Sequence, residues 1–399
     1  MKLCELLPWT EFLDVHIKKD PGLFPIYISN HYKIPFEIAY IHGNNKSTKI
    51  SNLDNGIIKP LRPIIKHRII KLFDLRRILF LFPLILYVFK NRKTNTHYLL
   101  FHTTENSFAL IFFIKLFNPH AKIWLKLDAN LEGLKNFLDN INKKNTFKEK
   151  LLFTRYRHLL SKIDLISTET QCTYDILKED SFFNTLNIHI IPNGIEKNTA
   201  NKEIDKQKII ISVARYGTYQ KNTELLLNVL SRLELKDWQV FLIGPIETAE
   251  QNFQSKIDVF FENFPELKQK INFIGNINDK QIINNYYEKA QVFVLPSRFE
   301  SFGIATLEAL SYGDFVILTD VGAARDFITN DEVGYILPES EQNKQNEEII
   351  ENTLVNKLQE IIDGKMNVEK KSDFRVNYFK QYSMDNIVQT PAIKDWITK

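Results

Sequence analysis

Two glutamates in one short stretch have the types and placement to bind a polar ligand. Glu300 lies in a polar loop after the predicted strand Gln291–Leu295, and Glu308 follows eight positions later in the predicted helix Phe302–Tyr312. The first turn of a helix leaves backbone N–H groups free to bind an anion such as phosphate, and Gly303 has no Cβ to keep a ligand away. Carboxylates repel phosphate, so the two glutamates suit hydroxyl groups instead. An anion slot with a hydroxyl acceptor on each side would suit a nucleotide-sugar.

The spacing of the two glutamates carries little weight alone, because such pairs arise by chance in most chains of this composition. The alternative for Glu308 is a solvated helix face. Its apolar neighbours Leu307, Ala309 and Leu310 indicate a short, well-packed helix. The compact order of strand, loop, glutamate, glycine, helix and glutamate therefore favours a binding site.

Two cations follow another predicted strand, Lys208–Ala214. Arg215 and Lys221 lie in the loop ARYGTYQKN, with Gly217 between them to allow flexibility. An arginine fork and a lysine point charge can together neutralise a diphosphate, which would stabilise charge on a nucleotide diphosphate leaving group. The alternative is an ordinary surface loop, since single cations in loops are common.

The first half of the chain offers further polar residues near the ends of predicted strands and at turns. His102 ends HYLLFH and could contact a sugar or shape an acceptor site, although a structural histidine is the usual alternative. Asp128 ends KIWLKLDAN and could orient an acceptor or the following helix. Asp20 and Gly22, in the turn DPG, belong either to a loop that faces an acceptor or phosphate, or to a helix start with Asp20 as its cap.

Composition and missing motifs exclude several classes of protein. With 52 basic and 48 acidic residues the net charge is +4, which gives no general case for nucleic-acid binding. No Asp-x-Asp, Walker, Gly-x-Gly-x-x-Gly or Gly-x-Ser-x-Gly motif occurs, so we expect no metal site and no cofactor. Cys4 and Cys172 lie far apart without metal-ligand partners, which favours a reducing compartment, by default the cytoplasm.

The 399 residues suggest about two domains at roughly 150 to 200 residues each, and both halves alternate strands with helices. This alternation predicts α/β architecture: two doubly wound, Rossmann-like domains facing each other across a cleft, with ligands at the carboxyl ends of the strands. We expect domains at residues 1–194 and 208–382, a polar linker at 195–207, and a C-terminal helix at 383–399 that packs back on the first domain. The predicted strands are Phe36–Ile41, Tyr98–Phe101, Lys122–Leu127, Leu165–Thr168, Ile188–Ile191, Lys208–Ala214, Trp238–Ile243, Ile271–Ile274, Gln291–Leu295, Phe315–Leu318 and Gly334–Leu337. The predicted helices are Gly22–Asn30, Leu61–Asn91, Ser107–Phe117, Leu131–Ser161, Gln171–Lys178, Asn222–Leu233, Gln251–Lys268, Asp279–Lys289, Phe302–Tyr312 and Asn346–Asp363.

The segment Leu61–Lys93 is strongly basic, with nine Lys or Arg residues against the single acid Asp74. A basic amphipathic helix can lie on an anionic membrane surface, and a core-facing helix with a solvated cationic face is an equal alternative. The longest apolar run, Ile78–Phe89, has twelve residues and contains Pro83, which is too short to span a bilayer. The N-terminus shows no pattern of a secretory signal.

These motifs together resemble the retaining glycosyltransferases of family 4, the glycosyltransferase group 1 enzymes with the GT-B fold. The similarity covers most of the second half. Stretches that carry it are SVARYGTYQKNTELLL, VFLIGP, and the long run from INFIGNIND to VGAARDFI, which includes both glutamates; IPNGI resembles the usual entry to the linker.

The resemblance implies a role for each matching residue. Arg215 and Lys221 would bind the donor diphosphate, Glu300 the donor sugar, and Glu308 the ribose. The backbone of Phe302 and Gly303 would contact sugar and phosphate. Gly275 would border the nucleobase, and His102 would line the reaction centre with Glu300, while Asp20, Gly22 and Asp128 remain acceptor-side candidates.

The implied reaction is transfer of a hexose or N-acetylhexosamine from a nucleotide-sugar, most simply a UDP-sugar, with retention. The expected acceptor is a saccharide or lipid-linked saccharide in the synthesis of a bacterial surface glycan such as capsule, lipopolysaccharide or exopolysaccharide. This predicts a metal-independent enzyme in the cytoplasm, peripheral on the inner face of the membrane if the basic segment binds it. The alternatives are a nucleotide-sugar epimerase of the same fold and a non-catalytic partner subunit that binds a sugar-nucleotide.

Overall fold

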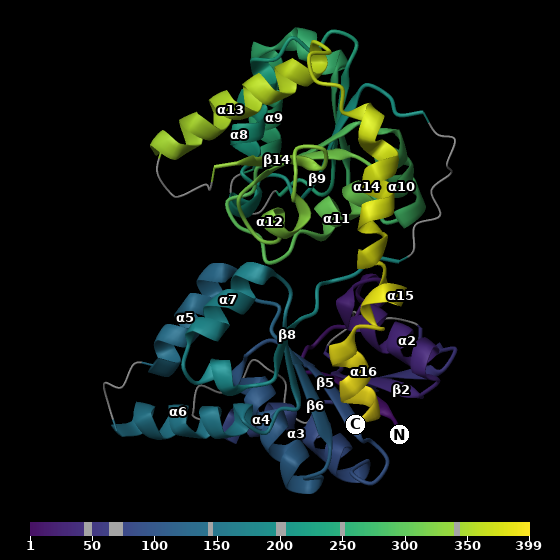
Figure 1. Ribbon diagram of the computed structural model, residues 1–399, viewed down its shortest axis with the longest axis vertical. Coiled ribbons are helices and arrows are strands. Elements are labelled where there is room, and N and C mark those ends of the chain that lie inside the picture. The colour runs from purple at the N-terminus through teal and green to yellow at the C-terminus, as the bar shows by residue number, and fades with distance from the viewer. Residues whose placement is uncertain (44–49, 64–74, 143–146, 197–204, 248–251, 339–343) are drawn as a thin grey trace. The chain divides into compact units, whose positions relative to one another are not determined.

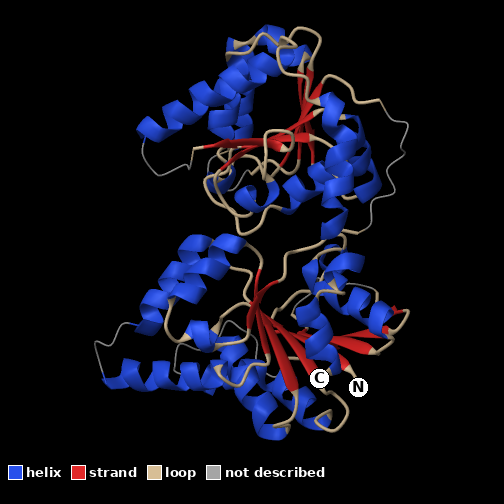
Figure 2. Cartoon of the chain, in the orientation of Figure 1, coloured by secondary structure: helices blue, strands red, loops and turns tan. Residues whose placement is uncertain are grey.

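The protein consists of two compact units. A computed structural model describes residues 1–43, 50–63, 75–142, 147–196, 205–247, 252–338 and 344–399. Unit 1 comprises Met1–Glu196 and Ser383–Lys399, and unit 2 comprises Lys197–Tyr382 (Figure 1). Each unit is a sheet flanked by helices (Figure 2). Most of the predicted linker, at 197–204, lies outside the described residues.

The sheet of unit 1 has eight strands in the order β3-β4-β2-β1-β5-β6-β7-β8. All neighbouring strands are parallel except β3 and β4. The sequence turns back across the sheet between β1 and β5, and open α/β sheets bind ligands at such a switch point. The strands are β1 Leu3–Leu7, β2 Phe36–Ile41, β3 Asn52–Leu53, β4 Gly56–Leu61, β5 His97–Phe101, β6 Lys122–Lys126, β7 Leu165–Thr168 and β8 Ile188–Ile190.

The helices of unit 1 correct two predictions from the sequence. Leu61 belongs to β4, so the predicted helix Leu61–Asn91 is wrong at its start; α3 is Leu75–Lys90, and residues 64–74 lie outside the described part. The single predicted helix Leu131–Ser161 is two helices. The remaining helices are α1 Asp14–Ile17, α2 Asp20–Tyr32, α4 Glu105–Phe117, α5 Leu131–Asn142, α6 Phe147–Leu160, α7 Gln171–Glu179, the 3-10 turn η1 Phe183–Thr185, α15 Met384–Ile387 and α16 Pro391–Thr398.

The C-terminal segment packs on the sheet of unit 1. Trp396 of α16 lies edge-on to Trp124 of β6, with ring centroids 5.5 Å apart. The carbonyl oxygen of Trp396 also lies 3.1 Å from the Nε2 atom of His97. Because Met384, Ile387 and Ile393 join the same apolar cluster, the last residues complete one face of this unit.

The sheet of unit 2 has six strands, all parallel, in the order β11-β10-β9-β12-β13-β14. In chain order this is 3-2-1-4-5-6, the Rossmann arrangement, with its switch point between β9 and β12. The strands are β9 Ile209–Val213, β10 Gln239–Ile243, β11 Ile271–Gly275, β12 Val292–Leu295, β13 Phe315–Thr319 and β14 Gly334–Leu337.

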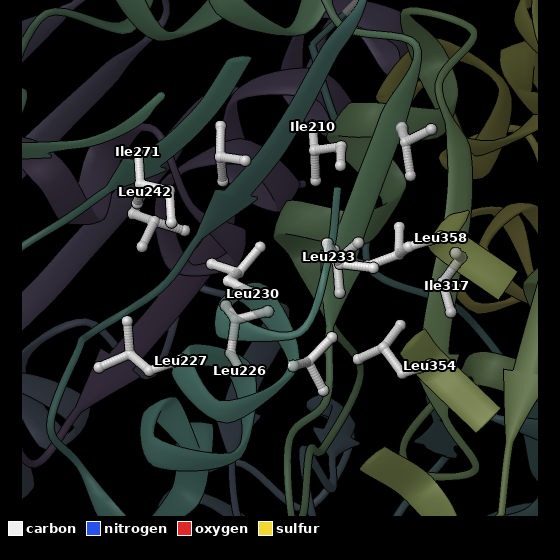
Figure 3. Packing of buried hydrophobic residues seen from close by; sticks show 14 of the residues in the cluster. Ile210, Leu226, Leu227, Leu230, Leu233, Leu242, Ile271, Ile317, Leu354 and Leu358 are labelled. Atoms are coloured by element: carbon white, nitrogen blue, oxygen red, sulfur yellow. The ribbon is translucent and has the colours of Figure 1, made fainter. Parts of the chain in front are cut away.

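Aliphatic side chains fill the space between this sheet and the helices on one face. Figure 3 shows leucines of α8 and α13 meeting Ile210, Leu242 and Ile317 of the strands. Burial of each such side chain contributes about 1.5–3 kcal/mol to the stability of the fold. This core therefore fixes the strands, and with them the positions from which the loops at the strand ends begin. The helices are α8 Thr223–Ser231, α9 Phe253–Asn263, α10 Lys280–Lys289, α11 Ile304–Ser311, α12 Ala324–Phe327, α13 Lys344–Ile362 and α14 Ser372–Phe379, with 3-10 turns η2 Tyr219–Lys221, η3 Pro265–Gln269, η4 Glu369–Lys371 and η5 Lys380–Tyr382.

A buried ion pair lies beside β13. The Lys206 ammonium donates to the Asp314 carboxylate at 2.5 Å and to the Tyr287 carbonyl at 2.9 Å. Burial raises the pKa of Asp314 from its ordinary 3.8 to about 7, although Lys206 opposes the shift. The folded state therefore holds a proton on Asp314 between these two values, while the unfolded chain has lost it.

This pair predicts a pH dependence of stability. The unfolding free energy should fall as pH rises from about 4 to about 7, by at most about 1.4 kcal/mol per pH unit from this group. Asp314→Asn removes the titrating group, so its urea-unfolding midpoint should change less than wild type across that window. Equal slopes for the two proteins would contradict the assignment.

Candidate functional site

Two loops of unit 2 meet at the switch point of its sheet. One follows β9 and carries Arg215 and Lys221; the other follows β12 and carries Glu300. Because β9 and β12 are neighbouring parallel strands, their carboxyl ends deliver both loops to the same edge. The Lys221 ammonium forms an ion pair with the Glu300 carboxylate, and both side chains are largely buried.

The Glu300 carboxylate is held by two further donors. The Ser297 hydroxyl donates to Oε1 at 2.7 Å, and the Gln220 amide donates to Oε2 at 3.3 Å. Gln220 also accepts from the guanidinium of Arg215 at 3.0 Å, so it links that cation to the glutamate. Ser297 is fully buried, and its carbonyl accepts from the Thr319 hydroxyl at 2.5 Å. These contacts hold the Glu300 carboxylate against Lys221 and link it through Gln220 to Arg215.

Glu308 has its own set of partners on α11. It pairs with the Lys280 ammonium from the start of α10, and the Tyr287 hydroxyl donates to its Oε2 at 3.2 Å. Burial, and then the charge of Glu308, raise the pKa of Tyr287 well above its usual range, so the phenol stays neutral and remains a donor. The sequence did not indicate Lys280 or Tyr287, because neither belongs to a motif.

Glycines shape the backbone around these side chains. Gly303 is the N-cap of α11 with φ 100°, and an added Cβ would lie 3.6 Å from the Thr306 hydroxyl oxygen, which is ordinary van der Waals contact. Gly275, at the end of β11, has φ 78° and open space at its Cβ position. At Gly322 (φ 60°) a Cβ would lie 2.8 Å from the Cβ of Glu300. Phe302 is 4% exposed and packs edge-on to Phe327, so only its backbone can serve a ligand.

Arg298, in the same loop as Glu300, has a different set of contacts. Its guanidinium donates to Glu347 of α13 at 2.6 Å and stacks on Tyr219 at 4.4 Å from the ring centroid. It also donates to the Tyr219 carbonyl at 2.9 Å. These contacts tie the loops after β9 and β12 to α13.

In unit 1 the carboxyl ends of β5 and β6 bring His102 and Asp128 together. Nδ1 of His102 lies 3.9 Å from Oδ2 of Asp128, and both side chains are partly exposed. Both residues have positive φ, 61° and 43°, which is uncommon for residues other than glycine and is often found at functional sites. The structure therefore places the two predicted residues side by side at the carboxyl ends of β5 and β6.

Asp20 and Gly22 have structural contacts. Asp20 is the first residue of α2, not its cap, and its carboxylate lies 3.2 Å from the Lys126 ammonium in a buried position. At Gly22 a Cβ would lie 2.2 Å from the carbonyl oxygen of Ile17, so close packing requires glycine. The cap alternative for Asp20 is wrong because Lys19 holds the N-cap position.

The sequence did not reveal the buried network around Lys126. Its ammonium is fully buried and contacts Glu169 and Asn193 as well as Asp20. Although burial alone would lower it, the pKa of Lys126 is raised because Glu169, Asp20 and Asp128 surround it. Burial raises the pKa of Glu169 to about 8. The network lies beside His102 and Asp128, since it sits at the ends of β6, β7 and β8.

Within the described residues, no group of three or more His, Cys, Asp or Glu side chains has the arrangement of a metal site. In the same part of the chain, no helix has both the length and the hydropathy needed to cross a membrane.

Parts of the chain are similar in sequence to known proteins. Residues 194–363 match the family model of glycosyl transferases group 1. Glycogen synthase of Desulfitobacterium hafniense is 30% identical over 130 residues, which is 33% of this chain and 26% of that protein. Mannosylfructose-phosphate synthase of Agrobacterium fabrum is 25% identical over 226 residues, 51% of this chain and 48% of that protein. The chain thus spans about half or less of the curated relatives it matches.

Solved structures show the same fold over the whole chain. The apo form of the lipopolysaccharide outer core galactosyltransferase WaaB has a TM-score of 0.68 at 16% identity, covering 100% of this chain and 99% of that one. Anabaena Alr3699/HepE in complex with UDP has a TM-score of 0.63 at 14% identity, covering 98% of both chains. The two Rossmann-like units are those of the GT-B glycosyltransferase fold.

Proposed function

We propose that this protein is a hexosyltransferase that uses a nucleotide-sugar donor, with the donor bound at the switch point of unit 2. The observation that carries the proposal is the joining of Arg215, Lys221 and Glu300 by direct contacts and through Gln220. The match of residues 194–363 to group 1 glycosyltransferases supports it. A bound UDP in HepE supports UDP as the first nucleotide to test.

Each group has a role in this proposal. The diphosphate lies against Arg215, Lys221 and the N-terminus of α11, which stabilise the charge that develops on the leaving nucleotide. Glu300 accepts from hydroxyls of the sugar, and Ser297 keeps its carboxylate in place. Glu308 accepts from the ribose hydroxyls and Gly275 borders the base. Transfer proceeds with retention by a front-face displacement, as the resemblance to family 4 implies.

We further propose that the reaction needs no metal ion or other cofactor. The two cations and the helix N-terminus supply the positive charge that a divalent ion would otherwise give to the diphosphate. If this is correct, a chelator leaves the rate of UDP release unchanged.

On the acceptor side we propose His102 and Asp128, whose side chains meet at the edge of the first sheet. His102 lines the reaction centre, and Asp128 orients it or an acceptor hydroxyl. Asp20 and Gly22 act behind them through packing. The acceptor is a saccharide or lipid-linked saccharide in bacterial surface glycan synthesis, and the protein works at the inner face of the cytoplasmic membrane. The exposed apolar residues of α3 and α4 support the membrane location.

The function is tested by a thermal-shift screen of UDP-, GDP-, ADP- and dTDP-sugars, followed by measurement of nucleotide release with the best binder. A ligand at 100 times its dissociation constant stabilises the protein by about 2.7 kcal/mol, which is easily detected. Release of nucleotide with sugar joined to an acceptor or to water supports a transferase. Conversion of the donor to an epimer would instead support an epimerase, and binding without any reaction would support a non-catalytic partner.

The ribose role of Glu308 makes a prediction of its own. Glu308→Ala should weaken UDP binding by about tenfold to a hundredfold, since a hydrogen bond to a charged group contributes about 1.5–3 kcal/mol. Binding of 2′,3′-dideoxy-UDP should be weak already and should not change with the substitution. Calorimetric titration of both ligands measures this, and an equal loss for both would show that Glu308 acts elsewhere.

A further inference from the structure

Two neighbouring helices of unit 1 expose large apolar side chains in one place. Among the described residues, sixteen large hydrophobic side chains are exposed, and six of them lie on α3 and α4. We call these six the α3–α4 ridge; their side chains are 37–56% exposed. They are Ile78, Phe82, Leu86, Phe89, Phe112 and Leu116.

The spacing of these residues forms a continuous strip. On α3 they recur at intervals of four, four and three, so they follow one face over about 16 Å at 1.5 Å per residue. On α4, Phe112 and Leu116 are also four apart.

Helices α3 and α4 lie next to each other (Figure 1). Arg77 pairs with Glu105 near the starts of the two helices. Near their ends, the ring centroids of Phe89 and Phe117 are 5.2 Å apart, so the two helices run in the same direction. The ridge is therefore one surface rather than two separate strips.

The charge around the ridge is positive. Lys90 and Lys93 are exposed at the end of α3, and Arg92 lies over the ring of Phe89 at 4.2 Å. Three acids that contact these helices or their side chains, Glu37, Glu105 and Asp164, are each paired with a cation. In the whole segment 61–93 nine basic residues stand against one acid.

We propose that the α3–α4 ridge inserts into the interfacial layer of an anionic lipid bilayer, with the lysines at the end of α3 on the headgroup phosphates. An apolar face with cations along its border is the pattern of helices that lie in a membrane interface. A second copy of this chain fits less well, because a contact between two copies over the ridge would bring two positively charged borders together without an acidic partner surface. The bilayer would be the surface on which the proposed glycosyltransferase reaches a lipid-linked acceptor, and in that respect the inference rests on the proposed function.

Vesicle flotation of the full chain tests the proposal. Wild type should float with phosphatidylcholine vesicles that contain phosphatidylglycerol, less with pure phosphatidylcholine, and less again at high salt, since salt screens charge. Phe82→Ser with Leu86→Ser should lower the partition coefficient roughly tenfold or more. Lys90→Gln with Lys93→Gln should remove the preference for anionic vesicles.

A matched control is Val259→Ser with Ile349→Ser, which removes two exposed apolar side chains of unit 2 and should leave flotation unchanged. Equal flotation of the ridge variant and this control would overturn the proposal. So would a dimer, seen by light scattering, that the ridge variant alone abolishes while vesicle binding persists. The UDP-induced thermal shift of each variant separates the two proposals. If the protein floats with vesicles but does not bind UDP, the donor site is refuted and the membrane role of the ridge stands. If it binds UDP but does not float, only the membrane role of the ridge is refuted.

Discussion

Lys221→Ala should slow nucleotide release from the donor sugar by about 10²–10³-fold, the loss typical of removing one group that stabilises developing charge. Lys221 is mostly buried and pairs directly with Glu300, so the substitution removes a diphosphate cation and frees the carboxylate it holds. Glu300 would keep only Ser297 and Gln220 as described donors. An unpaired carboxylate near the phosphates adds repulsion to the lost attraction. The measurement is the steady-state rate of UDP release with the best donor from the screen.

The control for this substitution is Lys208→Ala. Lys208 is a lysine of the same unit that lies just before β9, but it pairs with Asp237 at the surface, where both side chains are more than half exposed. A surface ion pair of this kind contributes about 0–1 kcal/mol to stability. The Lys208→Ala variant should therefore fold normally and release UDP at the wild-type rate. If both variants released UDP at the wild-type rate, Lys221 would have no part in the reaction.

Lys126→Met should lower the stability of unit 1 by about 3–5 kcal/mol, because it removes one partner from a buried ion network. The substitution leaves Asp20 and Glu169 without their cation in a site where burial already raises the pKa of both. Without Lys126 these values rise further above their values in the unfolded chain. Since stability from a raised carboxyl pKa is lost as pH rises, the deficit of the variant should grow from pH 5 to pH 8.

Urea unfolding followed by tryptophan fluorescence measures this loss, because Trp124 lies two residues away on the same strand. Lys122→Met is the matched control. Its ammonium is on the same strand, partly exposed, and lies 3.5 Å from the Trp396 carbonyl. A change of about 1 kcal/mol or less is expected there. Equal destabilisation by the two substitutions would contradict the role of the network.

The second unit was the more predictable from sequence. Its strands are continuous apolar runs such as Val292–Leu295, and Gly or Pro residues mark where several elements end. Each predicted strand of this unit therefore matches an observed strand to within about one residue. The loops after β9 and β12 carried the cations and glutamates, and the strand order brings them together. In this unit the sequence pattern of each element is therefore consistent with its place in the sheet.

The first unit was less predictable for physical reasons. β1, Leu3–Leu7, was missed because Glu5 interrupts its apolar run, yet Glu5 is fully buried in the strand. Neither of its carboxyl oxygens has a hydrogen-bond partner among the described residues, and burial raises its pKa well above the usual range. Glu5 looks polar in the sequence, but its side chain is packed inside the core.

Contacts between distant segments were also beyond prediction. Lys126 meets Asp20 and Glu169 only because β6 lies between β5 and β7 and α2 packs on the same face. Lys280 reaches Glu308 from another helix. Residue types alone could not show such pairs, since lysines and glutamates are common at surfaces.

The most direct test of the donor site is hydrogen–deuterium exchange of the full chain with and without UDP. The site predicts slower exchange on adding UDP in two segments, 214–222 after β9 and 297–308 after β12. Residues 1–43 and 105–142 of unit 1 should be unaffected. Protection confined to unit 1, or no protection in either segment at UDP concentrations that shift the thermal unfolding, would contradict the assignment of the donor site.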